Sequence, residues 1–481
     1  MNTPASTPAS DPVSTPSPRG PSTILHIGLG SFHRAHQAVY LQALHDAGDP
    51  GWSIVAGNLR DDMAATMAAL LSQQGQYTVE TVSSAGDRQY QRIGVIREVI
   101  AFEPSLSRQV AVGAEASTRI ISFTVTEAGY YLDAAHRLDP GHADLRADLD
   151  DGGARTIYGA LARILGRRLR AGGAAVTLLS CDNLRSNGKR MRAGLLEFLH
   201  RRGDQVLHDW VRDHTSSPCN MVDRITPRPP AELAERVKSA TGFDDRAAVM
   251  GERFIQWVIE DHFVAGRPAW ERVGAELVQS VHAHEEAKIR ILNASHSCVA
   301  WAGTLMGLSF IHEDMAVPAI RQLAFDYVTQ DVMPCLDTPA QPSPIRLADY
   351  RDVVLERFSN PFVLDTNQRV AMDGFSKLPG FIVPTLRECL ERGVSAHATA
   401  MLPALYFHVL ARWHRGELGY DYQDGVMDVA QAHAFFDAAD PLAAFAADAV
   451  LWGPLAADPR LLDHLRQADQ RVHRLLTQAA R

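Results

Sequence analysis

The chain contains very little lysine. Lys189, Lys238, Lys288 and Lys377 are its only lysines, so arginine supplies 43 of its 47 Lys and Arg residues. Arginine stays protonated in proteins, whereas a buried lysine can have its pKa lowered and act as a general base. A sequence in which nearly every basic residue is arginine is expected to keep lysine mainly at positions where arginine cannot perform the same function. Lys288, which lies in the most distinctive motif of the chain, is therefore a candidate proton acceptor.

Cysteine is also sparse, and its spacing argues against two kinds of site. The cysteines are five in number, widely separated and without a CxxC pair: Cys181, Cys219, Cys298, Cys335 and Cys389. This pattern argues against a disulfide framework and against a structural zinc site. It indicates reduced thiols in a cytoplasmic protein.

Long apolar runs and blocks of positive charge are missing as well. The longest uncharged apolar run, residues 297–311, has 15 residues, whereas a bilayer span needs about 20. We expect a buried helix there and no membrane partner. The formal charge of −9, without a Lys/Arg block, argues against nucleic acid as a partner. Residues 1–23 include 15 Pro, Ser or Thr and no apolar segment, which predicts a disordered tail rather than a signal peptide.

Four apolar runs carry the fold prediction. They occupy residues 24–30, 52–58, 119–124 and 174–180, each is followed by polar residues, and helical stretches such as 33–45 separate them. This alternation predicts an α/β fold with a Rossmann-like, doubly wound parallel sheet. From about residue 284 the periodicity is helical. At 481 residues we expect a nucleotide-binding domain over 24–283 and a mostly helical substrate and catalytic domain over 284–481.

A glycine-rich turn follows the first apolar run. Residues 28–33 (GLGSFH) match GxGxxH, in which His33 replaces the third glycine. The two glycines allow a tight turn and a close approach of the backbone to a pyrophosphate. Alone the motif is weak, but the predicted strand before it strengthens it.

Two carboxylates, Asp61 and Asp62, follow the second apolar run. An acid there can bind the adenosine ribose hydroxyls and repel a 2′-phosphate, which favours NAD over NADP. Capping of a helix N-terminus is the alternative role for the pair. Arg60 leaves the use of NADP open.

Lys288, Asn293 and His296 are spaced to share one arc of a helix. At about 100° per residue, Asn293 lies about 140° and His296 about 80° from Lys288. A base, a neutral amide and an imidazole suit an alcohol that loses a proton while its oxygen becomes carbonyl-like. The alternative is an amphipathic helix in which Ile289 and Leu292 pack into a core and the Lys288 side chain reaches the surface.

Other catalytic templates fit worse. The sequence has no GxxxxGK[ST], GxSxG, HExxH or YxxxK motif. His282 and His284 have no thiolate or carboxylate partner at ligand spacing, so we expect no metal site.

The chain resembles the polyol-specific long-chain dehydrogenases, the mannitol dehydrogenase family. The resemblance spans most of the chain from residue 24, and it lies in GLGSFHRAHQAVY (28–40), TVTEAGYY (124–131), SCDNLRSNG (180–188), MVDRITP (221–227), KIRILNASHS (288–297) and RVAMDGFSKLP (369–379). Within that family, AGNLRDD (56–62), GERFIQWVIED (251–261) and TNQRVAMDGFSKLP (366–379) are most similar to the D-arabinitol 4-dehydrogenases.

The resemblance implies an NAD-binding domain, a helical domain, metal-free chemistry in the cleft between them, and a monomer. By motif position it implies Lys288 as general base, Asn183 and Asn293 as the oxyanion hole, and His296 as the residue that orients the reacting hydroxyl. The implied substrate contacts are Asp223, Arg369 and Lys377, with Asn187 as the alternative to Asn183 in the same loop. The implied cofactor contacts are Gly28, Leu29, Gly30, Phe32, His33, Arg34, Asp61, Asp62, Thr126 and Glu127.

The leading expectation is therefore NAD-dependent interconversion of D-arabinitol and D-xylulose. A mannitol 2-dehydrogenase, which interconverts D-mannitol and D-fructose, and a hexuronate reductase are the alternatives within the family. A catalytically silent sensor of nucleotides or sugars is the alternative from another class, and it would have no need of a lysine that can lose its proton.

Overall fold

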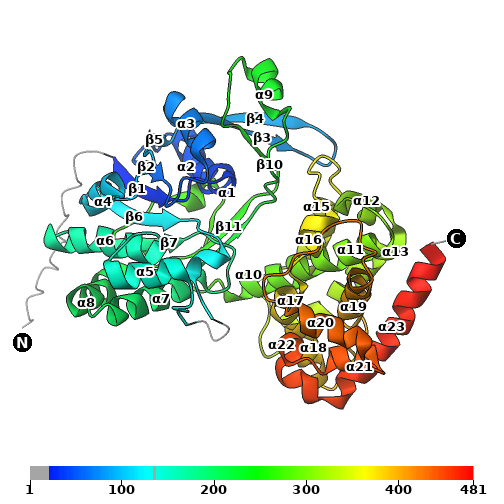
Figure 1. Ribbon diagram of the computed structural model, residues 1–481. Coiled ribbons are helices and arrows are strands. Elements are labelled where there is room, and N and C mark those ends of the chain that lie inside the picture. Colours follow the sequence, from blue (N-terminus) through cyan, green and yellow to red (C-terminus); the bar gives the residue numbers. More distant parts are fainter. Residues whose placement is uncertain (1–20, 134–136, 480–481) are drawn as a thin grey trace, which may run out of the picture.

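The computed structural model describes residues 21–133 and 137–479, which form an α/β part followed by a helical part (Figure 1). Of the tail predicted over residues 1–23, residues 1–20 lie outside the described residues. Ser22 and Thr23 already belong to the first strand. That strand therefore starts two residues earlier than the apolar run alone indicated.

A six-stranded parallel sheet forms the centre of the α/β part, in the order β5-β2-β1-β6-β7-β8. The strands are β1 (Ser22–Ile27), β2 (Trp52–Gly57), β5 (Ile96–Val99), β6 (Thr118–Phe123), β7 (Val176–Ser180) and β8 (Thr215–Ser216). Each of the four apolar runs supplies one strand, so the predicted Rossmann-like sheet is confirmed. The chain order reverses between β1 and β6, and ligands bind beyond the carboxyl ends of strands at such a switch point.

Helices separate the parallel strands along the chain and pack around them (Figure 1). They are α1 (Ser31–Ala35), α2 (Gln37–Asp46), α3 (Ala64–Ser72), α4 (Ser107–Ala114), α5 (Ala143–Asp151), α6 (Ile157–Arg170), α7 (Asn187–Arg201) and α8 (Gln205–His214), with the 3₁₀ turn η1 (Glu127–Tyr130). The helix α9 (Leu233–Thr241) and the 3₁₀ turn η2 (Trp270–Val273) follow the last strand of this sheet. The helix predicted over 33–45 is interrupted at His36, whose φ of −127° and ψ of −86° are not helical. The ring of His36 is buried, and its Nε2 lies 2.9 Å from the carbonyl oxygen of Gln256.

Two smaller three-stranded sheets extend the α/β part, in the orders β10-β3-β4 and β12-β11-β9. Their strands are β3 (Tyr77–Val82), β4 (Arg88–Ile93), β9 (Asn220–Asp223), β10 (Val249–Glu252), β11 (Gln256–Glu260) and β12 (Glu276–Val278). The β3–β4 hairpin reaches toward the helical part, since a Cβ added to Gly86 would lie 2.7 Å from the ring of Phe362.

The helical part begins with one continuous rod, formed by α10 (His282–Ala287), the π-helix η3 (Lys288–Asn293) and α11 (Ala294–Leu305). The other helices are α12 (Ile311–Ala316), α13 (Pro318–Asp326), η4 (Tyr327–Val332), α14 (Met333–Leu336), α15 (Leu347–Phe358), α16 (Asn367–Ala371), α17 (Gly374–Lys377), η5 (Leu378–Ile382), α18 (Val383–Glu391), α19 (Met401–His414), α20 (Val429–Asp437), α21 (Pro441–Ala446), α22 (Ala449–Trp452), η6 (Gly453–Ala457) and α23 (Pro459–Ala479).

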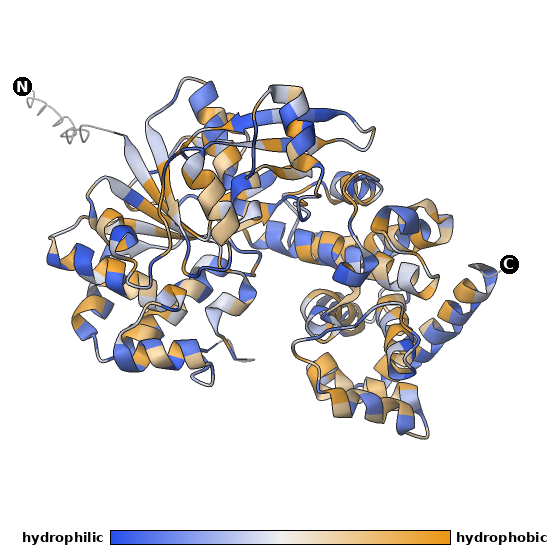
Figure 2. Cartoon of the chain, turned by 45° about the horizontal axis from the view of Figure 1, so that its top comes forward, coloured by the Kyte–Doolittle hydropathy of each residue, from blue (hydrophilic) through white to orange (hydrophobic). Residues whose placement is uncertain are grey.

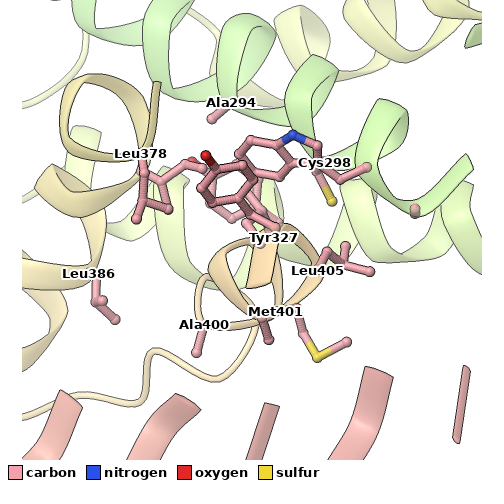
Figure 3. Close-up of a cluster of buried hydrophobic side chains, with 14 of the residues drawn as sticks. Ala294, Cys298, Tyr327, Leu378, Leu386, Ala400, Met401 and Leu405 are labelled. Carbon is pink, nitrogen blue, oxygen red and sulfur yellow. The ribbon is translucent and has the colours of Figure 1, made fainter. Parts of the chain in front are cut away.

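The core of the helical part forms around α11. Ala294, Cys298, Tyr327 and Leu405 belong to this buried cluster, and Figure 3 shows their side chains gathered between the helices. Trp301 is fully buried, and its Nε1 donates to the carbonyl oxygen of Ala371 at 3.1 Å. The apolar run 297–311 is thus largely a buried helix, as its composition predicts.

The surface of the chain follows from the pattern of its helices. Polar and apolar residues alternate as stripes along the helices of both parts (Figure 2), which is typical of helices that cover a core. Among the described residues no helix is both long and apolar enough to cross a membrane. All five cysteines are buried and unpaired.

A buried arginine joins the two parts. Arg357 on α15 donates to both carboxylate oxygens of Asp223, at 2.8 and 2.9 Å, and to both oxygens of Glu252, at 2.7 and 3.0 Å. Asp223 and Glu252 end β9 and β10, and at most 5% of any of these three side chains is exposed. Because one side chain of α15 bonds to the ends of two strands in different sheets, this contact fixes the helical part against the α/β part.

Replacement of Arg357 by Met should be strongly destabilising. It removes the cation to which both buried carboxylates are hydrogen-bonded, and removal of one partner of a buried ion pair costs about 3–5 kcal/mol. Arg346→Met is the matched control, because Arg346 precedes the same helix and forms only an exposed pair with Asp349. Urea denaturation should show a large fall of the midpoint for Arg357→Met and almost none for the control. Equal midpoints for the two variants would contradict the structural role of Arg357.

Candidate active site

A cavity of about 1430 Å³ opens between the two parts of the chain. Its walls come from the loops after β6 and β7, from the end of β9, from the rod and from the segment 362–381. Among the lining residues predicted from sequence are Phe32, Glu127, Asn183, Asp223, Lys288, Asn293, His296, Arg369 and Lys377. The structure thus gathers side chains that lie almost 350 positions apart along the chain around one space.

Lys288 lies at the wall of this cavity with only its terminal nitrogen held by polar groups. The Nζ atom donates to Asn183 Oδ1 at 2.7 Å and to the carbonyl oxygen of Val222 at 2.6 Å. The residue is only 6% exposed. A neutral amine keeps two N–H bonds, which is enough for these two acceptors and leaves its lone pair to accept a proton.

The rod is a π-helix at the position of the motif, and this corrects the geometry expected from an α-helix. The N–H of Ala294 bonds to the carbonyl of Ile289, an i→i+5 contact that defines a π turn. The wider turn brings Asn293, five residues after Lys288, nearer to the face of Lys288 than the 140° of an α-helix would. Single π turns inside α-helices occur frequently at functional sites.

The electrostatic surroundings of Lys288 favour its neutral form. Burial lowers the pKa of Lys288, nearby Asp223 opposes this, and Arg357 lowers the pKa further, so the net shift is downward. Burial raises the pKa of the Asp223 carboxyl, but Arg357 and Lys288 outweigh burial and hold that pKa below its usual value. The site therefore places a carboxylate whose ionised form is stabilised beside an amine whose charged form is destabilised.

His296 is held between an aromatic ring and a carboxylate. Its ring stacks on Phe358 with a centroid distance of 4.6 Å, and its Nε2 lies 3.2 Å from Asp365 Oδ2. Burial lowers the pKa of His296 against the opposing effect of Asp365, so the imidazole is neutral near pH 7. Arg369 pairs with the same Asp365, at 2.7 and 2.5 Å.

Lys377 is the second lysine of the cavity. Its Nζ donates to the carbonyl oxygens of Val370 and Met372, at 2.8 and 2.6 Å. Burial lowers its pKa to about 8, against the opposing effect of Asp373. Two of the four lysines of the chain thus line one cavity.

The structure separates the two asparagines that sequence could not distinguish. Asn183 is exposed in the cavity wall, and its amide group is left to donate because Oδ1 accepts from Lys288. Asn187 is fully buried and bonds only to backbone: Nδ2 donates to the carbonyl oxygens of Asp182 and Asn220, and Oδ1 accepts from the N–H groups of Gly188 and Asn220. The prediction that Asn187 contacts substrate is therefore wrong, because its polar atoms are all used to join α7 to β9.

The glycine turn lies at the carboxyl end of β1 and has the form of a nucleotide cradle. Gly28 has a φ of +101°, and an added Cβ would lie 2.1 Å from the carbonyl oxygen of Thr124. An added Cβ on Gly30 would meet nothing closer than 3.9 Å, so its backbone faces open space. Asn58, just after β2, accepts from the N–H of Leu29 at 2.7 Å and fixes the turn. These residues fit a pyrophosphate that approaches the backbone.

Three of the predicted cofactor contacts, Leu29, His33 and Arg34, have buried side chains. The side chain of Leu29 is fully buried in the core. His33 is 1% exposed, with its ring stacked 3.4 Å from that of His26, and Arg34 is buried with its guanidinium on the carbonyl oxygen of Ala247. The side chains of His33 and Arg34 are therefore occupied, and that these residues contact a cofactor stays a prediction for their backbone groups alone. A sequence pattern fixes their positions in α1 but not the direction in which they point.

The two carboxylates after β2, Asp61 and Asp62, remain free to contact a cofactor. Asp61 and Asp62 are exposed, and the N-cap position of α3 is Met63 without a side-chain cap, so the alternative helix-capping role does not apply. Arg60 donates to Tyr131 Oη and to Asp144, both at 2.9 Å. Thr126, after β6, is exposed, and its N–H donates to Asp182 at 2.8 Å.

Three residues that sequence reasoning missed support the site. Asp182 accepts from the N–H groups of Val125 and Thr126 and from Tyr130 Oη, and burial raises its pKa to about 6. Asp365 holds His296 and Arg369, and Arg357 holds Asp223. Asp182 was within a motif stretch and could have been singled out as an acid directly after a strand. Arg357 and Asp365 lie in no recognised pattern.

Two family models match the chain. The model described as the mannitol dehydrogenase Rossmann domain matches residues 22–272, and the one described as the mannitol dehydrogenase C-terminal domain matches residues 280–473. A D-arabinitol 4-dehydrogenase of Ralstonia nicotianae is 58% identical over 93% of this chain and 96% of its own length. One from Klebsiella pneumoniae is 52% identical over 94% of this chain and 99% of its own length.

A solved structure is also similar over nearly the whole chain. It is the mannitol 2-dehydrogenase of Pseudomonas fluorescens in a ternary complex with NAD and D-mannitol. It has a TM-score of 0.83 and 32% identity, over 96% of this chain and 94% of the other.

The two asparagines should respond differently to replacement by Ala. Asn187→Ala removes four bonds to buried backbone groups and should cost about 2–4 kcal/mol, because an unsatisfied buried group costs about 1–3 kcal/mol. Asn183→Ala should lower the thermal midpoint less, since this side chain is exposed and it removes one bond, that from Lys288. Thermal unfolding of both variants checks this contrast, and a fall as large in Asn183→Ala as in Asn187→Ala would contradict it.

Proposed function

Because this chain belongs to the mannitol dehydrogenase family, and is a polyol dehydrogenase, we propose that it oxidises D-arabinitol to D-xylulose with NAD⁺ and catalyses the reverse reduction. The high identity to two D-arabinitol 4-dehydrogenases over nearly their full lengths supports this substrate. The observation that carries the chemistry is the Lys288 amine, which is buried at the cavity wall, has a lowered pKa and is hydrogen-bonded to Asn183.

A nicotinamide cofactor is supported by the residues that follow the strands at the switch point of the sheet. The turn Gly28–Gly30, Thr126 and Glu127 lie at the carboxyl ends of β1 and β6. We assign the pyrophosphate to the backbone of the glycine turn and the adenosine ribose to Asp61 and Asp62. Exposed carboxylates at that point would repel a 2′-phosphate, and Arg60 is already paired with Asp144, so NAD is favoured over NADP. When bound, NAD⁺ supplies the acceptor for the hydride of the carbinol carbon.

The remaining chemistry belongs to side chains of this protein, and no metal is required in it. Neutral Lys288 takes the proton of the reacting hydroxyl while that oxygen develops into a carbonyl. The amides of Asn183 and Asn293 donate to the oxygen and stabilise its negative charge without adding a group that titrates. His296, held by Phe358 and Asp365, orients the same hydroxyl. Arg369 and Lys377 bind the other hydroxyl groups of the polyol, and Asp223 holds the charge balance around Lys288.

Substrate and cofactor preference can be read from the absorbance of reduced nicotinamide. NAD⁺ and NADP⁺ should each be assayed with D-arabinitol, D-mannitol, D-sorbitol, xylitol and L-arabinitol. We expect the highest kcat/KM with NAD⁺ and D-arabinitol, and a relative gain with NADP⁺ in Asp61→Ser/Asp62→Ser. Preference for D-mannitol would contradict the substrate, and silence across the panel with intact nucleotide binding would contradict turnover of any of these polyols.

The pH dependence of oxidation tests the role of Lys288. The base must be neutral, so kcat/KM for oxidation should rise with pH through one ionisation and reach a plateau above the pKa of Lys288. Because burial lowers that pKa, the rise should be centred below the 10.4 of a free lysine. Lys288→Ala should lose this ionisation and roughly 100-fold or more of kcat, the usual contribution of a general base.

Added primary amines should restore part of the activity of Lys288→Ala, with a pH dependence that follows the pKa of the amine. A control for Lys288→Ala must leave the fold intact, which excludes Asn187→Asp because the Asn187 side chain bonds to buried backbone groups. Lys189→Ala is suitable, since this exposed lysine lies outside the cavity, and it should keep the wild-type profile. A wild-type pH profile in Lys288→Ala would rule out Lys288 as the base.

A further inference from the structure

Two histidines and one aspartate converge far from the cavity, between the helices α19 and α23. His408 comes from α19, and Asp469 and His473 come from α23. The nearest ligand atoms of these three side chains all lie within 4.8 Å of one another. None of the three lines the active-site cavity, and the proposed reaction uses none of them.

The ring nitrogens of both histidines point to one carboxylate. His408 Nε2 lies 2.8 Å from Asp469 Oδ1, and His473 Nε2 lies 3.8 Å from Asp469 Oδ2. The two rings meet edge to face, with centroids 4.8 Å apart and an interplanar angle of 88°. Asp469 and His473 are four residues apart, so they project from the same face of α23.

This donor set has the chemistry and the spacing of a transition-metal site. Imidazole nitrogen and carboxylate oxygen are ordinary zinc ligands, and tetrahedral bonds of about 2.0–2.1 Å hold ligand atoms about 3.4 Å apart. The observed separations bracket that value. His473 is 67% exposed and has the most room to move, while His408 and Asp469 are 15% and 25% exposed, and the 2.8 Å between these two must lengthen slightly. Solvent access at His473 also leaves room for a fourth ligand.

The backbone on which the ligands stand is rigid. Leu461, Leu465, Ala468 and Val472 of α23 are buried in the core of the helical part. The ligand residues Asp469 and His473 directly follow two of these buried positions. A metal ion at this point would therefore join two helices that are already packed together. Little further conformational entropy would be lost when it binds.

We propose that His408, Asp469 and His473 bind a divalent transition-metal ion, zinc or one of similar ligand preference, which fastens the C-terminal helix α23 to α19. The site is structural and lies apart from the metal-free chemistry of the cavity. Since only the folded chain brings the three ligands together, the ion stabilises the fold by mass action.

The test uses the full-length chain after removal of any histidine tag and of bound metal with a chelator. Titration with ZnCl₂ in a calorimeter should show one zinc bound per chain. The thermal midpoint should rise by roughly 2–3 °C at a hundredfold excess of free zinc over Kd, because about 2.7 kcal/mol is then spread over the unfolding entropy of a chain of this length. His473→Gln removes an exposed ligand without disturbing the core, and it should weaken zinc binding by roughly tenfold or more and abolish the rise in midpoint.

His464→Gln is the matched control, because it removes a histidine from the same helix and leaves the three ligands intact. It should bind zinc with the wild-type Kd and show the same rise in midpoint. Absence of a stoichiometric zinc site in the wild type, unchanged binding in His473→Gln, or loss of binding in His464→Gln would each overturn the proposal. Polyol oxidation by the metal-free chain is measured in parallel, and its failure would bear on the reaction and not on this site.

Discussion

The structure depends on a balance of buried charge at the junction of its two parts. Lys288 and Arg357 come from the helical part, and Asp223 and Glu252 come from the ends of two strands of the α/β part. Burial of any one of these charges alone would cost several kcal/mol. Together, two cations and two carboxylates offset one another, and Arg357 takes the larger share of the negative charge because it bonds to both carboxylates. Lys288 is thereby left as the cation that is most easily neutralised.

The geometry of the site depends in turn on the rod that carries Lys288. A regular α-helix would have turned Asn293 well away from the lysine, and the π turn reduces that divergence within a single element. The rod is anchored to the helical part at two points: Arg290 within the π turn bonds to Glu388 of α18, and Trp301 further along bonds to Ala371. An irregular turn is stable here because the packing on either side of it is regular.

Much of the fold could be predicted from the sequence because its strands are continuous apolar runs and its catalytic motif is compact. The four runs form four parallel strands, and Lys288 and Lys377 both line the cavity. The sequence could not predict the direction in which a side chain points, even where it predicted the position of the residue. Asn183 and Asn187 share a loop, yet one faces the cavity and the other is enclosed by backbone. His33 follows the glycine turn at the correct spacing, yet its ring packs inward on His26.

The contribution of Arg357 and Asp365 could not be predicted for a different reason. Each acts through another residue, Arg357 through Asp223 and Asp365 through His296, and both contacts join distant parts of the chain. The break at His36 also depends on a distant partner, the carbonyl of Gln256. Such residues leave no local pattern, since their role exists only after the chain has folded.

The hydrogen bond from Lys288 to Asn183 also bears on how a protein of this kind can evolve. Lys288 is encoded in one half of the gene and its amide partner Asn183 in the other, and the same is true of Arg357 and its two carboxylates. Recombination at the boundary between the halves would exchange a binding module but would also separate each of these pairs. The two halves are therefore expected to be inherited together, and new substrate preferences to arise by substitution at the cavity wall rather than by exchange of domains.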